Sequence, residues 1–272
     1  MRNTVINSFV DIFNQIPSDR VYIQNVSESV TFGDIDNLIS QFCNDYPFLL
    51  GKNCALLSSS RFRLAKTLPL VASVANRIFL KPQSLNGIVE QDLYIKAGIE
   101  YVINATESSI IVTQLPDVDS SSSLEQEWLL STSGTTGTPK LMSYNLDSLM
   151  KTSQKNIEKG AGYKWGLCYD LNRFSGLQVY LQAIASGSSL AISEPEASLS
   201  DTVILFIDKG VNCVSATPSF WRKVLMTKNS KLMDLKRITL GGEISDQTVL
   251  NLLKKHYENS DIVHIYASTE TG

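Results

Sequence analysis

Apolar residues recur along the chain with two different spacings. Apolar side chains at every third or fourth position predict amphipathic helices, and short apolar runs bounded by Gly, Pro or Asp predict buried strands. The predicted helices cover residues 5–16, 31–43, 63–76, 87–98, 148–160, 175–187, 201–210, 218–226 and 245–259. The predicted strands cover residues 54–59, 77–82, 100–104, 109–115, 127–133, 163–170, 189–193, 211–218, 235–243 and the start of 261–272.

Two residues qualify the helix predictions. Thr31 stands just before the apolar repeat of residues 31–43, where a threonine hydroxyl is suited to cap the first turn. Pro69 falls inside the apolar repeat of residues 63–76. Because proline lacks a backbone N–H, we expect it to bend or interrupt that helix.

Strands and helices alternate along nearly the whole chain. This order is typical of the α/β class, in which parallel strands are covered by helices. Residues 116–127 are polar and serine-rich and resemble a surface linker. The sequence therefore predicts two parallel-sheet α/β subdomains, one over residues 1–122 and the other over residues 123–272.

Composition narrows the choice of partners and compartment. The net charge is −3, which does not favour nucleic acid as a partner. The four cysteines form no CxxC pair, as expected for free thiols in a reducing compartment. No apolar run approaches the ~20 residues that span a bilayer, and no signal-peptide block precedes the first helix. We expect a cytoplasmic protein with neither nucleic acid nor a membrane as partner.

Residues 131–140 read STSGTTGTPK and form the most distinctive stretch of the chain. Gly134 and Gly137 allow tight turns and close approach of the backbone to a ligand, and hydroxyls and loop N–H groups can bind phosphate oxygens. Lys140 adds a positive charge. The stretch lacks the GxxxxGK[ST] order of the common phosphate loop. A polyphosphate-binding loop is favoured, and a flexible linker is the alternative.

Three unusual loops each follow a predicted strand. They are residues 131–140, the turn at 241–243 and the end of the chain from residue 266. Ligands of open α/β sheets bind outside the carboxyl ends of the strands. We therefore expect these loops to contribute to one ligand site.

The same segments resemble a known family. LSTSGTTGTPK (130–140) resembles the phosphate-loop signature of the adenylate-forming enzymes, which include acyl- and aryl-CoA ligases, adenylation domains of peptide synthetases and luciferases. LKRITLGGE (235–243) and IYASTETG (265–272) resemble two further family motifs in the same order. Weaker similarity at 30–42 and 210–225 extends the resemblance over essentially the whole chain, which looks like the larger part of the family's N-terminal domain.

The resemblance implies a two-step reaction and a set of site residues. A carboxylic acid and ATP would give an acyl-adenylate and pyrophosphate, and a thiol, from coenzyme A or the pantetheine of an acyl carrier protein, would then take the acyl group. The phosphates would be bound by Thr132, Ser133, Gly134, Thr135, Thr136, Gly137, Thr138 and Lys140. The nucleotide would also contact Gly241, Gly242, Glu243, Tyr266, Ala267, Ser268 and Thr269. Glu270 would hold Mg²⁺, and Lys140, Thr269 and Glu270 would be the catalytic residues.

Three departures from the family pattern affect these expectations. Ala267 stands where the family usually has glycine, which we expect to have a modest effect. Arg173 stands where many acyl-CoA ligases have histidine, three residues before Gly176. It could bind a second carboxylate or a phosphate of the substrate, or it could be an ordinary surface arginine. We take Arg173 and Gly176 as candidate substrate residues.

The third departure concerns the family's C-terminal segment, whose counterpart we do not find after Gly272. From this we expect an N-terminal part with low activity of its own, and a non-catalytic nucleotide-binding fragment is the alternative function. We also expect an apolar surface that favours a homodimer.

Overall fold

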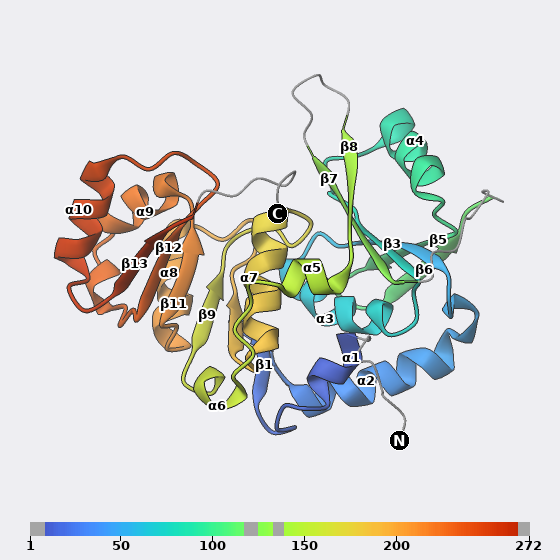
Figure 1. Ribbon diagram of the computed structural model, residues 1–272, viewed down its shortest axis with the longest axis horizontal. Coiled ribbons are helices and arrows are strands. Elements are labelled where there is room, and N and C mark those ends of the chain that lie inside the picture. Colours follow the sequence, from blue (N-terminus) through green and yellow to red (C-terminus); the bar gives the residue numbers. More distant parts are fainter. Residues whose placement is uncertain (1–8, 117–124, 133–138, 266–272) are drawn as a thin grey trace. The chain divides into compact units, whose positions relative to one another are not determined.

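The computed structural model describes residues 9–116, 125–132 and 139–265. The chain divides into two compact units. Unit one comprises Met1–Arg20 and Val30–Lys151, and unit two comprises Val21–Ser29 and Thr152–Gly272. Figure 1 labels the helices and strands of both.

Among the described residues, unit one is built on a six-stranded sheet in the order β6-β5-β3-β4-β7-β8. The strands are β3 (Asn53–Leu57), β4 (Arg77–Leu80), β5 (Tyr101–Ala105), β6 (Ile110–Gln114), β7 (Glu127–Thr132) and β8 (Lys140–Tyr144). The four central strands are parallel, while β6 and β8 pair antiparallel at the two edges. Apolar residues fill the central strands, as expected for a parallel sheet covered on both faces.

The helices of unit one form close to the predicted ranges, except for a 3-10 turn that was not predicted and a last helix that differs from its prediction. They are α1 (Phe9–Phe13), α2 (Phe32–Asp45), the 3-10 turn η1 (Pro47–Leu49), α3 (Arg61–Ala72), α4 (Gly87–Ala97) and α5 (Leu146–Met150). Thr31 caps α2 in a capping box with Asp34, as predicted. Pro69 does not interrupt the helix, because α3 continues through it to Ala72. Pro69 is buried among apolar neighbours on α3, and such packing can offset the missing hydrogen bond.

The division into units differs from the predicted boundary at residue 122. Strand β7 follows the serine-rich segment in sequence, yet it pairs in parallel with β4, with Arg77 opposite Glu127. Residues 127–144 therefore belong to the first sheet. In the other direction, β1 (Val21–Gln24) leaves the N-terminal part of the chain and pairs in parallel with β10 of unit two. Residues 117–124 of the predicted linker lie outside the described residues.

Unit two is built on a seven-stranded sheet among the described residues, in the order β13-β12-β11-β9-β10-β1-β2. The strands after β1 are β2 (Ser29–Thr31), β9 (Lys164–Leu167), β10 (Ser189–Ile192), β11 (Cys213–Ala216), β12 (Arg237–Leu240) and β13 (Asp261–His264). The pairings from β1 to β13 are all parallel. Together the two sheets confirm the predicted α/β class, with antiparallel edges added in unit one.

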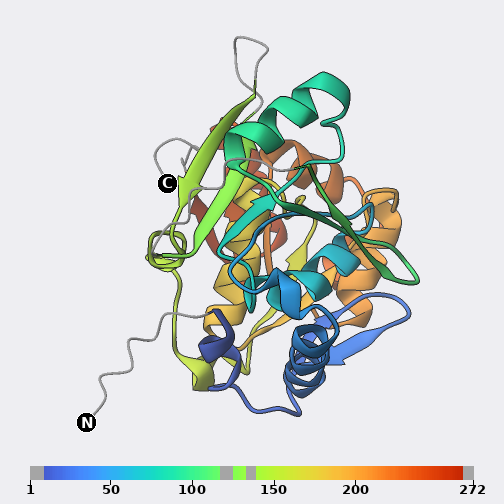
Figure 2. The ribbon, with the colours of Figure 1, turned by 90° about the vertical axis from the view of Figure 1, so that its right-hand side faces the viewer.

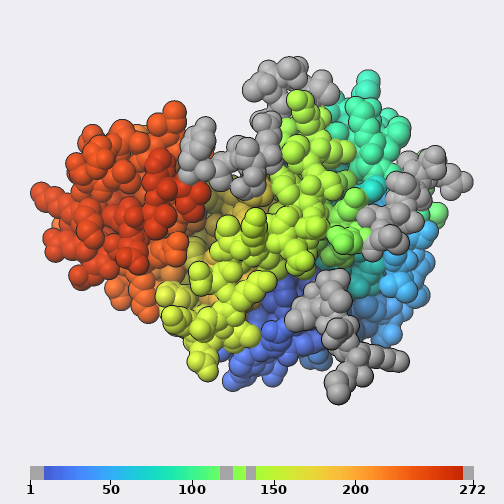
Figure 3. Space-filling model, viewed as in Figure 1, coloured from blue at the N-terminus to red at the C-terminus, as the bar shows by residue number. Residues whose placement is uncertain are grey.

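The helices of unit two connect successive parallel strands, except for the first, which precedes β9. They are α6 (Ile157–Gly160), α7 (Phe174–Ala185), α8 (Leu199–Asp208), α9 (Pro218–Leu225), the 3-10 turn η2 (Ser230–Leu232) and α10 (Gln247–His256). Trp221 of α9 is fully buried and donates from its indole Nε1 to the Thr239 carbonyl of β12 at 3.2 Å. This contact fixes α9 against the sheet. The outer sides of α9 and α10 form orange and red surface at the left of Figure 3.

The helix predicted over residues 148–160 is wrong as a single element. The structure has α5 and α6 instead, with residues 151–156 outside any helix. Each short helix begins at an asparagine whose side chain accepts from a backbone N–H of the first turn, Asn145 for α5 and Asn156 for α6. A second cap inside the segment starts a second helix rather than continuing the first. No helix among the described residues is long and apolar enough to cross a membrane.

Candidate functional site

The phosphate-loop segment connects two paired strands of unit one. Strands β7 and β8 are antiparallel, and the register places Thr132 opposite Lys140. The two residues that bound the segment 133–139 are therefore neighbours across the hairpin. Lys140 is exposed and Thr132 is partly exposed, so both side chains are accessible to a ligand. Ser133, Gly134, Thr135, Thr136, Gly137 and Thr138 lie outside the described residues.

Helix α4 supports the hairpin from one side. Leu93, Tyr94 and Ala97 of α4 pack in one apolar cluster with Leu129 of β7, and Leu141 of β8 packs against it. The helix lies beside the hairpin in both views (Figures 1 and 2). This packing gives the ends of the candidate phosphate loop a rigid base.

An ion pair between a buried lysine and a partly exposed glutamate links α4 to the carboxyl end of β4, the strand next to β7. Lys81 follows β4 directly, and its Nζ lies 2.9 Å from Glu90 Oε1 with the lysine side chain 6% exposed. The Tyr94 hydroxyl donates to the same carboxylate at 2.9 Å, and burial raises the pKa of Tyr94. Lys81 is not among the residues predicted from the sequence, although a lysine directly after an apolar run and before Pro82 is an available signal.

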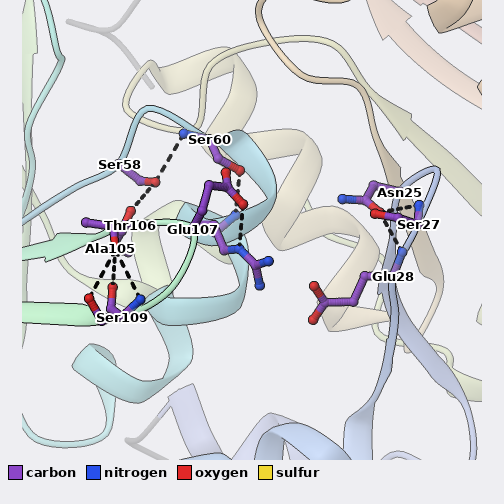
Figure 4. A network of polar contacts seen from close by, with 10 residues as sticks. Asn25, Ser27, Glu28, Ser58, Ser60, Ala105, Thr106, Glu107 and Ser109 are labelled. Carbon is purple, nitrogen blue, oxygen red and sulfur yellow. Dashed lines mark hydrogen bonds and ion pairs between the residues drawn. The ribbon is translucent and has the colours of Figure 1, made fainter.

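Hydrogen bonds from hydroxyl groups stabilise the loops at the carboxyl ends of β3 and β5 (Figure 4). Ser58 donates to the Ala105 carbonyl at 2.6 Å and accepts from the Ser60 backbone at 3.1 Å. Thr106 and Ser109 close the turn after β5, where the Thr106 hydroxyl donates to the Ser109 carbonyl at 2.8 Å. These bonds are explained by loop geometry, and we assign them no ligand.

In unit two, the strands that follow β9 and β11 in the chain are added on opposite sides of this pair. From β9 the chain crosses through α7 to β10 on one side, whereas from β11 it crosses through α9 to β12 on the other. Such a topological switch point opens a crevice outside the carboxyl ends of the two strands. The loop at 168–173 follows β9, and Thr217 joins β11 to the start of α9, so the topology favours a ligand site there.

The predicted Gly-Gly-Glu turn is present directly after β12. Gly241 donates its backbone N–H to the Ala216 carbonyl of the neighbouring β11 at 3.2 Å. Gly242 has a φ of +79°, a left-handed conformation that glycine adopts without strain. The turn thus needs glycine at position 242 for its backbone, while the space around Gly241 is open, with the nearest atom to a Cβ at 3.7 Å.

Glu243 binds the first turn of α9 through its carboxylate. Its Oε2 accepts from the Ser219 backbone N–H at 3.0 Å and from the Ser219 hydroxyl at 2.6 Å. These hydrogen bonds, with the Ser219 hydroxyl contributing most, lower the pKa of Glu243 below its usual value. A carboxylate at a helix N-terminus is also favoured by the helix dipole. The Glu243 side chain therefore anchors the turn, which leaves the backbone of 241–243 as the part available to a nucleotide.

Two residues after β9 contact the neighbouring strands. The Tyr169 hydroxyl donates to the Gly241 carbonyl at 3.2 Å, and the Cys168 thiol lies 3.7 Å from the Ser215 carbonyl of β11. Burial raises the pKa of Tyr169, so its phenol stays protonated and able to donate. Tyr169 is not among the residues predicted from the sequence, because nothing in the sequence shows which loops lie next to each other at the end of the sheet.

Arg173 and Gly176 lie at the start of α7. Arg173 is the exposed N-cap residue, and its guanidinium has no ion pair within the part of the chain that the structure describes. Gly176 is buried, and a Cβ there would lie 2.1 Å from the Asp170 carbonyl oxygen. Close packing of α7 on the 170–171 backbone accounts for this glycine without a ligand. Arg173 is the exposed residue of this pair, and its contact with a substrate stays a prediction.

The last group of predicted residues lies outside the described part of the chain. It comprises Tyr266, Ala267, Ser268, Thr269 and Glu270, the candidate Mg²⁺ ligand. Among the described residues there is no group of three or more His, Cys, Asp and Glu side chains that could hold a metal ion.

Comparison with protein families identifies the chain. The model of the family described as AMP-binding enzyme matches residues 128–272, more than half of the 272 residues. The match contains the β7–β8 hairpin, the start of α7 and the turn after β12. The chain belongs to this family, as the motifs predicted. The comparison with curated proteins gave no match.

Solved structures share the fold over almost the whole chain. The N-terminal subdomain of NpsA from Klebsiella oxytoca, in complex with anthranilyl-AMSN, is 14% identical with a TM-score of 0.79, and the match covers 97% of this chain and 75% of that one. The N-terminal domain of FACL13 from Mycobacterium tuberculosis is 14% identical with a TM-score of 0.77, and the match covers 97% of this chain and 77% of that one.

The O-succinylbenzoate coenzyme A synthetase MenE from Bacillus subtilis, in complex with AMP, is 17% identical with a TM-score of 0.74, covering 97% and 74%. At these identities the likeness shows the fold. It confirms the expected resemblance to the N-terminal domain of adenylate-forming enzymes.

Proposed function

We propose that the protein adenylates a small carboxylic acid with ATP and passes the acyl group to a thiol. The observation that carries this proposal is the β7–β8 hairpin. It joins Thr132 to Lys140 across the ends of a hydroxyl- and glycine-rich segment, in a chain that belongs to the AMP-binding enzyme family. The thiol would be coenzyme A or the pantetheine of an acyl carrier protein.

Lys140 has the simplest role in this proposal. Its exposed ammonium group at the base of the hairpin would attract the phosphates of ATP and stabilise the charge that develops on the departing pyrophosphate. Thr132, one residue before the loop, could donate its hydroxyl to a phosphate oxygen. Glu270 would hold Mg²⁺, a cation that prefers oxygen ligands and offsets phosphate charge. Thr269 would contact the α-phosphate region.

The turn after β12 would contact the adenine through its backbone. The Glu243 carboxylate binds Ser219, and the Gly241 N–H and carbonyl bind Ala216 and Tyr169, so the glycine backbone would meet the base by packing against it. Glycines allow close approach of a flat ring to the backbone. The side chains of Tyr266, Ala267 and Ser268 would complete this part of the nucleotide site, as the family resemblance implies.

Arg173 suggests what kind of acid is bound. Its guanidinium is exposed at the N-terminus of α7, and the first turn of that helix contains no acidic residue. A positive side chain there receives no support from the helix dipole, whose N-terminal end is also positive. A second carboxylate or a phosphate on the substrate would be attracted by the Arg173 guanidinium and by the positive N-terminal end of the α7 dipole. We propose an acid with a second anionic group.

Acid-dependent exchange of labelled pyrophosphate into ATP tests the proposed adenylation. A panel should pair mono- with dicarboxylic acids of equal length, assayed with the parent chain and with Lys140→Ala, Arg173→Ala and the control Lys151→Ala, which removes an exposed lysine outside the site. We expect exchange with at least one acid, loss in Lys140→Ala, and selective loss for dicarboxylates in Arg173→Ala.

The exchange assay also distinguishes the proposed adenylation from the alternative function. ATP binding without exchange for any acid would favour a non-catalytic nucleotide-binding protein. Exchange that is equal in the parent and in Lys140→Ala would contradict the role assigned to the hairpin. The homodimer and the cytoplasmic location stay predictions, for which light scattering and cell fractionation are the measurements.

A further inference from the structure

The Gly241–Glu243 turn is held in place by three neighbouring segments of unit two. The end of β11 accepts the Gly241 N–H through Ala216, and the start of α9 binds Glu243 through Ser219. The third segment is the loop after β9, whose Tyr169 hydroxyl donates to the Gly241 carbonyl. The first contact comes from β11, which is next to β12 in the sheet, and the second comes from α9, which precedes β12 in the chain. The third comes from the loop after β9, and β11 lies between β9 and β12.

Tyr169 spans the carboxyl ends of three adjacent strands. The strand order places β11 between β9 and β12, so a side chain that starts after β9 and reaches the carbonyl after β12 passes over the end of β11. The neighbouring Cys168 makes its own contact to the Ser215 carbonyl, which fixes the start of the same loop.

This arrangement places the phenol at the topological switch point itself. The loop that contains Tyr169 leads within four residues to Arg173 and α7. The carbonyl that it binds belongs to the turn assigned above to the adenine. A single hydrogen bond of 3.2 Å therefore joins the loop before the acid-binding candidate to the nucleotide-binding candidate.

We infer that Tyr169 is a positioning residue of the nucleotide site, whose hydroxyl holds the Gly241 carbonyl so that the turn is preformed for the adenine of ATP or AMP. This inference rests on the proposed function, because it assigns the turn to the nucleotide. Preformed contacts strengthen binding by reducing the ordering that accompanies it. Tyr169 itself is not placed in contact with the reacting atoms.

Removal of the hydroxyl alone tests the inference. Tyr169→Phe keeps the ring that packs in the loop and removes the donor to Gly241. Tyr163→Phe is the matched control, since Tyr163 stands just before β9, at the opposite end of that strand, and is 38% exposed. Calorimetric titration with AMP measures the affinity, thermal unfolding measures stability, and amide hydrogen exchange at residues 241–243 measures the order of the turn.

We expect AMP to bind about fivefold more weakly to Tyr169→Phe than to the parent, as expected for one neutral hydrogen bond. Exchange at residues 241–243 should rise in the absence of nucleotide, and Tyr163→Phe should match the parent in both measurements. A merely structural hydroxyl would lower the unfolding temperature and leave the AMP affinity unchanged, and that result would overturn the inference.

The same titration distinguishes failure of the inference from failure of the proposed function. Equal AMP affinity in the parent and in Tyr169→Phe would overturn the role of Tyr169 and leave the proposed function standing. Absence of AMP binding to the parent chain would contradict the nucleotide site and the role of Tyr169 together.

Discussion

Gly176→Ala tests whether α7 is seated on the backbone of the preceding loop. A methyl group at position 176 would lie 2.1 Å from the Asp170 carbonyl oxygen, 2.6 Å from its carbonyl carbon and 3.0 Å from the Leu171 nitrogen. All three are backbone atoms, so no flexible side chain can give way. Overpacking of this kind costs about 1–3 kcal/mol, and the severity of this contact favours the upper end.

Alanine also has a higher helix propensity than glycine, which raises the free energy of unfolding by up to about 1 kcal/mol and offsets part of this cost. We therefore expect a net loss of about 2 kcal/mol in the free energy of unfolding. For a chain of this size, that corresponds to a fall of roughly 4–8 °C in the unfolding temperature. The start of α7, and with it Arg173, should also shift away from Asp170.

Thermal unfolding of Gly176→Ala beside Gly162→Ala is the assay. A Cβ at the exposed Gly162 would have only the Lys159 carbonyl oxygen within reach, at 3.6 Å, which is ordinary contact. The control should unfold within about 1 °C of the parent. If Gly176→Ala unfolded at the same temperature as Gly162→Ala, the close packing of α7 on the loop would be refuted.

Two further predictions concern the turn after β12. Gly242→Ala should lower the unfolding free energy by about 1 kcal/mol because alanine is strained at a φ of +79°. Gly241→Ala should be nearly neutral, because its methyl group would meet no atom closer than 3.7 Å. Urea unfolding of the two variants checks this prediction, and equal unfolding midpoints would contradict it. Glu243→Gln should lose the stabilisation that the lowered pKa of Glu243 provides. That stabilisation is fully present above the ordinary glutamate pKa and disappears as the pH falls through the lowered one, so the unfolding temperatures of parent and variant should differ at neutral pH and converge in acid. A difference that persisted in acid would assign the effect to packing.

Local patterns predicted most of the secondary structure. The apolar repeat and Thr31 located α2, and the short apolar runs located β3, β4 and the strands from β9 to β13 of unit two. These features depend on residues close together in the sequence, where periodicity and capping act directly. The helix over 148–160 failed for a local reason as well, since Asn156 caps a new helix that the apolar spacing did not reveal.

Features that depend on distant pairings could not be predicted. Strand β1 was missed, and nothing in residues 21–24 indicates that they pair with β10, more than 160 residues later. The serine-rich segment looked like a boundary between subdomains, yet β7 and β8 after it complete the first sheet because β7 fits beside β4. Composition shows where a loop lies and does not show which strands it connects.

The candidate site divides in the same way. The motifs located the loop after β7, the turn after β12 and the start of α7 by residue type alone, whereas strand β8, which pairs with β7 to form the hairpin, was not predicted. The partners that hold these segments, Ser219 for Glu243 and Tyr169 for Gly241, became visible only from the fold. Gly176 was assigned to the substrate by resemblance, and the structure gives it a packing role that sequence spacing could not reveal.

The central claim is that the β7–β8 hairpin binds the phosphates of ATP through Lys140. Calorimetric titration of the chain with MgATP, beside Lys140→Ala and the control Lys151→Ala, tests it most directly. We predict binding to the parent and to the control, and an affinity about tenfold lower in Lys140→Ala, as expected when one charge-assisted contact is lost. Equal affinity of all three proteins for MgATP, or no binding to the parent, would contradict the claim.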